Sequence, residues 1–262
     1  MSKSRLVPKR WVIKLGTGIL TDARGRIDHA QIEQLAAQVT ELRKRGYQVL
    51  VVSSGAVGCG MSLLGLKKRP TAISQLQACA ALGQPRLMSL YDEAFGRSKL
   101  YVAQILLTYL ELDSSSLYRN VQHSLETLLT RKNVVPIFNE NDVVSYDELI
   151  GARFGDNDRL SAHVAILARA ERLIILSNVR GLATNSDGTG KLIRDVRKID
   201  KRIEKLAGGT QSQTSVGGMI SKLKAARLVN DAGIPMQIAH GRQKDVLVSI
   251  CKGEQIGTMF HP

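Results

Sequence analysis

The sequence predicts an α/β sandwich in which helices cover both faces of a mainly parallel sheet. Short β-rich runs alternate with amphipathic helical patterns along most of the 262 residues, and this alternation favours parallel strands joined by helical crossovers. The runs VLVV at 49–52 and LIIL at 173–176 are continuously apolar, as strands buried under helices on both faces are.

The expected elements follow one another in a regular order. The first strand is WVIKLG at 11–16, and an amphipathic helix at 28–46 follows it and stops at a glycine. Further strands are expected at 47–55, 100–108, 134–142, 172–178 and 235–240. Further helices are expected at 74–95, 116–133, 158–170 and 221–233. The segment IRDVRKIDKRIEKL, at 193–206, is expected to be a solvated helix face because its opposite charges are interleaved.

Composition favours one globular domain over residues 1–262. Hydrophobic residues make up 44% of the chain, which argues against disorder. A second series of strands and helices starts near residue 170, but no linker composition marks a boundary there. One continuous sheet is therefore expected.

The net charge of +14 is the unusual feature of the composition. Such a charge attracts nucleic acid, acidic lipid or small polyanions. The basic residues are spread along the chain, and aromatic residues make up only 4%, which argues against stacking platforms for single-stranded nucleic acid. Surface chemistry and a small anionic ligand are favoured over nucleic-acid binding.

Several classes of protein lack support in the sequence. The three cysteines, Cys59, Cys79 and Cys251, are far apart and suggest neither a zinc site nor a disulfide framework. The five histidines form no ligand spacing, and no serine lies in a nucleophile-elbow pattern, so no metal ligand is assigned. No run of about 18 apolar residues suggests a membrane helix, and the basic start makes a poor secretory signal. We expect a cytoplasmic protein that does not bind membranes.

The polar residues of interest follow the expected strands, where ligands bind in open α/β sheets. Lys14 lies in an apolar strand, where its charge is costly unless it is compensated. The motifs LGTGIL and SSGAVGCG supply glycines that let backbone N–H groups approach a phosphate. Each motif alone could be an ordinary turn, but together with Lys14 they favour a phosphate site.

A second group of polar residues surrounds FGDNDRLSA and NEND. Asp156, Asn157 and Asp158 crowd together before an apolar helix, which exceeds what helix capping requires. Together with NEND at 139–142 they form a polar, partly anionic wall. Such a wall can hold an ammonium group and place metal-bound water.

The segment TSVGGMISKLKAA, at 214–226, places Lys222 near the expected start of a helix. A cation there opposes the helix dipole, a cost that is understandable if Lys222 reaches a phosphate. The alternative is a lysine that extends along the surface into solvent.

These motifs together resemble the amino acid kinase family. The matching stretches are VIKLGTGIL, VVSSGAV, VPIFNENDVV, FGDNDRLSA, GLATN and GGMISKLKAA. Their order and intervals cover nearly the whole chain, and the pairing of NEND with GDND is typical of the glutamate 5-kinase branch. The resemblance implies a three-layer αβα sandwich that binds ATP and an amino acid side by side. The implied reaction, with ATP as co-substrate and Mg²⁺, phosphorylates the γ-carboxylate of L-glutamate to give L-glutamyl 5-phosphate for proline biosynthesis.

The resemblance also implies roles for individual residues. The catalytic set is Lys14, which contacts the transferring phosphate, Lys222, which stabilises the transition state, and Asp158, which organises both lysines. The substrate-binding residues are Ser54, Gly55, Asn139, Asp142, Asp156 and Asn157. The nucleotide-binding residues are Lys14, Gly16, Ser177, Asn178, Val216, Gly217, Gly218, Met219, Ile220, Ser221 and Lys222. Because the attacking carboxylate, with a pKa of about 4.3, is already ionised at pH 7, no general base is required.

Two positions depart from the family pattern, both on the nucleotide side. Asn178 stands where an aspartate is usual, and Val216 where threonine or serine is usual. The chain ends about where the kinase domain would end, so a C-terminal PUA domain is expected to be absent. The resemblance further implies a homo-oligomer, a dimer or tetramer, with proline as a candidate feedback inhibitor.

Two other readings remain open from the residues alone. The chain can be another kinase of the family, acting on acetylglutamate, aspartate or a nucleoside monophosphate. It can also be a non-catalytic regulator that binds amino acid, nucleotide or nucleic acid.

Overall fold

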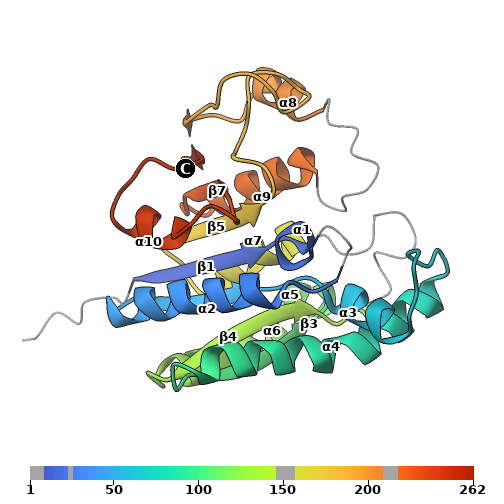
Figure 1. Ribbon diagram of the computed structural model, residues 1–262. Helices are drawn as coiled ribbons and strands as arrows, with labels where there is room; N and C mark the ends of the chain where they lie inside the picture. The colour runs from blue at the N-terminus through green and yellow to red at the C-terminus, as the bar shows by residue number, and fades with distance from the viewer. Residues whose placement is uncertain (1–8, 23–25, 146–156, 209–217) are drawn as a thin grey trace, which may run out of the picture.

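The computed structural model describes residues 9–22, 26–145, 157–208 and 218–262. Its centre is an eight-stranded sheet in the order β3-β4-β2-β1-β5-β7-β8-β6 (Figure 1). The strands are β1 Arg10–Leu15, β2 Gln48–Val52, β3 Tyr101–Leu107, β4 Val134–Glu140, β5 Arg172–Ser177, β6 Asp195–Val196, β7 Met236–His240 and β8 Thr258–Phe260. Neighbouring strands pair in parallel, except that β7 and β8 are antiparallel. The predicted mainly parallel α/β fold is confirmed.

The helices form the two outer layers of the sandwich. They are α1 Thr17–Leu20, α2 His29–Lys44, α3 Ala56–Leu63, α4 Ile73–Gly96, α5 Tyr109–Asp113, α6 Ser115–Leu129, α7 Asn157–Leu167, α8 Lys201–Ala207, α9 Met219–Asp231 and α10 Val246–Cys251. One apolar core joins the sheet to α2, α4 and α10. The other core joins the opposite face of the sheet to α6, α7 and α9.

The alternation of side chains along β1 decides which layer each residue faces. Trp11, Ile13 and Leu15 belong to the core shared with α2 and α4, whereas Val12 belongs to the core shared with α7 and α9. Because successive side chains of a strand point to opposite faces, Lys14 points to the same face as Val12. The first turns of α7 and α9 are therefore the elements that can meet Lys14.

The expected helix at 193–206 is partly wrong. Asp195–Val196 is strand β6, which pairs in parallel with β8, and helix α8 begins only at Lys201. Asp200 caps this helix, because its carboxylate accepts from the backbone N–H groups of Arg202 and Ile203. The charge pattern indicated solvent exposure but carried no signal for pairing with a strand at the end of the chain.

The short elements were also absent from the expectation. Helices α1, α3, α5 and α10 and strands β6 and β8 span eight residues or fewer, too few for a periodic pattern to stand out. In the part of the chain that the structure describes, no helix is both long and apolar enough to cross a membrane.

Candidate active site

Lys14 lies at the carboxyl end of β1, buried between the sheet and the helices behind it. Only 6% of the residue is exposed. Its Nζ lies 2.6 Å from Oδ1 of Asp158, the second residue of α7. A carboxylate from the facing helix thus compensates the buried charge that the sequence places in this strand.

Asp158 binds a second lysine with its other oxygen. Lys222 Nζ lies 3.0 Å from Asp158 Oδ2, and the Ser221 hydroxyl donates to the same oxygen at 2.6 Å. Both donors come from the first turn of α9, so Asp158 also offsets the unfavourable position of Lys222 near a helix N-terminus. Burial alone would raise the pKa of Asp158, but the ammonium groups of Lys14 and Lys222 hold that pKa well below its usual range.

Lys14, Asp158 and Lys222 bring three buried charged groups together. Two buried ammonium groups face a single ionised carboxylate at the carboxyl ends of the strands. Two ammonium groups held close together attract an anion, so the arrangement favours an anionic ligand beside the two lysines. Phosphoryl transfer uses this kind of charge stabilisation.

Asn157, one residue before Asp158, connects the two predicted polar motifs. Its amide nitrogen lies 2.7 Å from the Ser53 carbonyl oxygen, 2.9 Å from Ser54 Oγ and 3.1 Å from Asn139 Oδ1. Asn157 and Asn139 are both buried. The structure therefore brings Ser54, Asn139 and Asn157, one residue from each of three predicted motifs, together.

The amide oxygen of Asn157 differs from its amide nitrogen. It is buried and accepts no hydrogen bond from the described residues. Asp142 lies half-buried in the loop after β4, and Gly55, with φ of 107°, takes the left-handed conformation that glycine tolerates before α3. An amide oxygen and a carboxylate are suitable acceptors for an ammonium group.

Gln84 is a site residue that sequence reasoning missed. Its Oε1 accepts from Asn139 Nδ2 at 2.7 Å, and this bond orients the Asn139 amide so that its oxygen faces Asn157. Gln84 comes from the middle of α4, far from the strand ends in sequence. A polar residue within a mostly buried helix pattern was the only available signal.

The predicted nucleotide side lies on the other flank of β1. The Gly16 N–H donates to the Leu176 carbonyl at 3.2 Å, and Ser177 Oγ lies 3.4 Å from Asn178 Oδ1. A side chain added at Gly18 would stand 3.6 Å from Asn178 Nδ2. The turn after Lys14 therefore lies directly beside Ser177 and Asn178.

The remaining predicted nucleotide residues belong to the start of α9. Gly218 precedes the helix, Met219 is half-buried and Ile220 is 52% exposed. Asp156, Val216 and Gly217 lie outside the described residues. The departure at Val216 therefore stays a sequence observation, whereas Asn178 stands at the predicted place.

Comparison with known proteins agrees with this arrangement. A family model described as the amino acid kinase family matches residues 9–240. The chain belongs to the amino acid kinase family. Relatives within this family include glutamate 5-kinase of Dehalococcoides mccartyi, 43% identical over 97% of this chain and 69% of that protein. Glutamate 5-kinase of Clostridium perfringens is 42% identical over 99% of this chain and 98% of its own.

Solved structures of amino acid kinases share the fold at low sequence identity. A carbamate kinase from Giardia superposes with a TM-score of 0.66 at 17% identity, over 97% of this chain and 99% of that one. A UMP kinase from Bacillus anthracis superposes with a TM-score of 0.61 at 18% identity, over 97% and 96% of the two chains. The three-layer sandwich is thus the amino acid kinase fold.

Proposed function

We propose that this chain is a glutamate 5-kinase, which transfers the γ-phosphoryl group of ATP to the side-chain carboxylate of L-glutamate. The product is L-glutamyl 5-phosphate, which starts proline biosynthesis. The observation that carries the proposal is the Lys14–Asp158–Lys222 arrangement, in which two buried ammonium groups are held on one carboxylate beside a wall of amides. The glutamate 5-kinases at 42–43% identity support the choice of substrate.

The two lysines have separate tasks in this proposal. Lys14 binds the phosphoryl group in transfer, Lys222 stabilises the charge that develops on it, and Asp158 holds the two ammonium groups in register. A carboxylate oxygen of glutamate attacks the γ-phosphorus while the bond to the leaving ADP oxygen breaks. Since the attacking oxygen is already ionised at pH 7, positioning and charge stabilisation account for the chemistry.

Glutamate is held on the side of β2 and β4. Ser54, Gly55, Asn139 and Asn157 line this side. The Asn157 amide oxygen, which accepts no hydrogen bond from the described part of the chain, accepts from the α-ammonium group in this proposal. Asp142 supplies a second acceptor. Asp156 is assigned to the same side from the sequence.

The nucleotide is held on the side of β5 and α9. Gly16, Ser177 and Asn178 contact it from the strand ends, and residues 218–222 lie on the same side. Val216 and Gly217 are assigned to this side from the sequence. Within the described residues, no three or more His, Cys, Asp or Glu side chains cluster to hold a metal ion. In this proposal Mg²⁺ arrives on the ATP phosphates, where it neutralises their charge.

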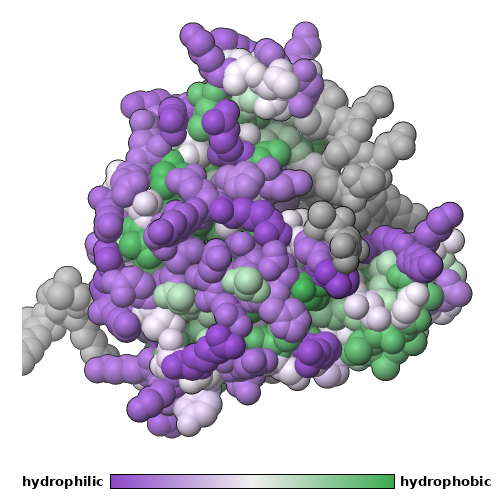
Figure 2. All heavy atoms as spheres, viewed as in Figure 1, coloured by the Kyte–Doolittle hydropathy of each residue, from purple (hydrophilic) through white to green (hydrophobic). Residues whose placement is uncertain are grey.

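Self-association is part of the proposal, as a dimer or tetramer. Five apolar side chains on and between α3 and α4 are exposed, which we call the α3–α4 apolar surface. They are Leu63, Leu64, Leu66, Ile73 and Leu82. Figure 2 shows the apolar residues gathering over this part of the molecule. Exposed apolar patches of this kind mark interaction sites.

Four further statements complete the proposal. The chain acts as one kinase domain over residues 1–262, proline is a candidate inhibitor, and nucleic acid is not a partner. A cytoplasmic location suits cysteines that stay reduced.

A hydroxylamine trap tests the reaction. Purified protein is incubated with ATP, Mg²⁺, L-glutamate and hydroxylamine, and glutamyl hydroxamate and ADP are measured. Lys222→Ala should lower turnover by roughly 100-fold or more, because it removes charge stabilisation in the transition state. Lys224→Ala is the matched control, since Lys224 lies two residues further along α9 but is exposed.

The control decides between outcomes. Hydroxamate that requires glutamate and is lost only in Lys222→Ala supports the proposal. Product formed from aspartate, acetylglutamate or a nucleoside monophosphate instead would replace the substrate. If folded protein forms no product from any of these acceptors, the assignment as a kinase is refuted.

A further inference from the structure

Helix α1 follows the phosphate-side turn and is too short to satisfy its own backbone. It spans only the four residues Thr17–Leu20, which follow Gly16 directly. The last carbonyl groups of any helix lack intrahelical partners, and in a helix of one turn these are most of its acceptors. Something outside the helix must therefore fix it.

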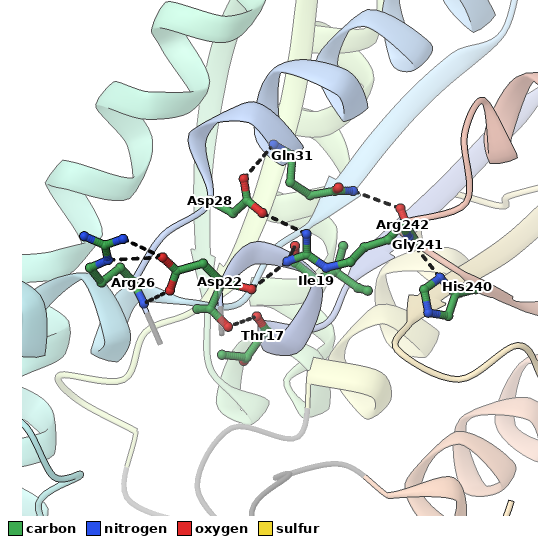
Figure 3. Close-up of polar contacts among 10 residues, drawn as sticks. Thr17, Ile19, Asp22, Arg26, Asp28, Gln31, His240, Gly241 and Arg242 are labelled. Atoms are coloured by element: carbon green, nitrogen blue, oxygen red, sulfur yellow. Dashed lines mark hydrogen bonds and ion pairs between the residues drawn. The ribbon is translucent and has the colours of Figure 1, made fainter. Parts of the chain in front are cut away.

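Arg242, in the loop after β7, supplies that attachment (Figure 3). Its Nη2 donates to the carbonyl oxygens of Thr21 at 2.6 Å and Ile19 at 3.3 Å. A guanidinium at this end of a helix also matches the helix dipole. Thr21 Oγ1 donates to the Thr17 carbonyl at 3.0 Å, so the carbonyl of the first helix residue also has a partner.

The same guanidinium binds the start of α2. Arg242 Nη1 lies 2.8 Å from Oδ2 of Asp28, the residue that caps α2. The side chain of Gln31, in the first turn of α2, donates to the Gly241 carbonyl at 2.9 Å. Figure 3 shows the end of β7, helix α1 and the start of α2 tied together by these contacts.

Close packing joins the same loop to the site strands. The Gly241 N–H donates to the Ser177 carbonyl at 2.9 Å. A side chain added at Gly241 would stand 3.0 Å from Ile19 carbons and from Leu176 Cβ, so α1 rests on the backbone beside Arg242. Helix α1 continues directly from Gly16, whose own N–H donates to Leu176.

We propose that Arg242 is a positioning residue for the nucleotide: it fixes α1, and thereby the Gly16–Gly18 turn beside Lys14, without touching either substrate. The inference rests on the proposed function for its ligand, a nucleoside triphosphate. Loss of the guanidinium lets α1 shift, so the turn no longer meets the phosphates in register. The amide wall that holds glutamate is attached to other strands and keeps its geometry.

The test uses nucleotide binding, which does not depend on turnover. Calorimetry with Mg·ADP should give a Kd raised roughly 10- to 100-fold in Arg242→Met, with kcat reduced and the KM for glutamate within about twofold of wild type. Arg242→Lys keeps the charge but not the planar fork, so it should restore part of the affinity. Asp28→Asn keeps a helix cap but removes the ion pair, and should weaken binding less than Arg242→Met does.

The matched control is Arg97→Met, because Arg97 ties α4 to α2 through Glu33 at 2.9 Å, also at the surface. An unchanged Kd in Arg242→Met, an equal loss in Arg97→Met, or a glutamate KM raised as much as the nucleotide Kd would overturn the inference. If Arg242→Met does not fold, Arg242→Lys and Asp28→Asn decide by the same criteria. Wild-type protein that binds Mg·ADP but makes no glutamyl phosphate would refute the proposed function while leaving this test intact.

Discussion

At the scale of single residues, Lys14 explains the unusual first strand. The charge of a lysine in an apolar strand is costly unless the facing helix compensates it. The two-residue period of β1 sends Lys14 toward α7, where Asp158 lies fully buried at 2.6 Å. Burial of the Asp158 carboxylate is tolerated because Lys222 and Ser221 also bind its other oxygen. The three charges are stable as a set and costly separately.

Replacing Asp158 by asparagine should expose that cost. Asp158→Asn leaves two buried ammonium groups facing each other, and we expect the free energy of unfolding to fall by about 3–5 kcal/mol near pH 7. Because the pKa of Asp158 is lower in the folded state than in the unfolded state, its stabilisation is complete above the unfolded value, about 3.9. It is then lost as the pH falls toward the folded value.

Urea unfolding at pH 7 and pH 3 measures this effect. The gap between wild type and Asp158→Asn should be smaller at pH 3 than at pH 7. Asp231→Asn, at the exposed end of α9, should differ little from wild type at either pH. A gap that stays equal at both pH values would contradict the charge compensation.

At the scale of elements, the sequence predicted what long periodic patterns can carry. The six long strands and the amphipathic helices α2, α6 and α9 were expected close to their observed bounds. Strand β8 has three residues, and its pairing with both β6 and β7 is a tertiary property. The site shows the same division. Residues at strand ends, such as Lys14 and Ser54, were predictable, whereas Gln84 comes from another element and is placed only by packing.

Helices α3 and α4 approach so closely that two glycines are required. A side chain at Gly60 would stand 1.8 Å from the Cys79 carbonyl oxygen, and one at Gly83 would stand 1.8 Å from that of Ala56. Those separations are far inside van der Waals contact, so the two backbones must move apart to admit even a methyl group. This helix pair carries Gln84 and follows Gly55, so its separation also sets the amide wall.

Alanine substitutions at the two glycines of α3 should therefore change the stability of the protein in opposite directions. Gly60→Ala forces the helices apart and should destabilise the protein by about 1–3 kcal/mol. Gly58→Ala is the matched control two residues earlier, with nothing within 4 Å of the added methyl group, and should stabilise by about 0.5–1 kcal/mol. Urea midpoints at constant slope measure both changes. Equal effects of the two substitutions would refute the close approach.

At the scale of the whole molecule, strand order explains how the two proposed substrate sides come to lie next to each other. Strand β1 has β2 and β4 on one flank and β5 and β7 on the other. The first flank delivers Ser54 and Asn139, and the second delivers Ser177 and Asn178. Lys14 stands at the junction, so the phosphoryl group can pass from the nucleotide flank to the amino acid flank across one residue. Strands β1 and β5, and β2 and β4, are neighbours in the sheet but not in sequence, which is why this division had to come from the fold.

The last prediction concerns assembly through the α3–α4 apolar surface. Light scattering and sedimentation should give a dimer or tetramer for the wild type. The double substitution Leu63→Glu with Leu82→Glu should weaken association by roughly 100-fold or more, because it places carboxylates on a surface that association would bury. Tyr101→Glu is the control, since Tyr101 is also exposed, at 64%, but starts β3 beyond the far end of α4. A monomeric wild type, or association unchanged by the double substitution, would assign this surface to some other contact. Because α3 begins directly after Gly55, loss of assembly should also raise the KM for glutamate more than that for ATP.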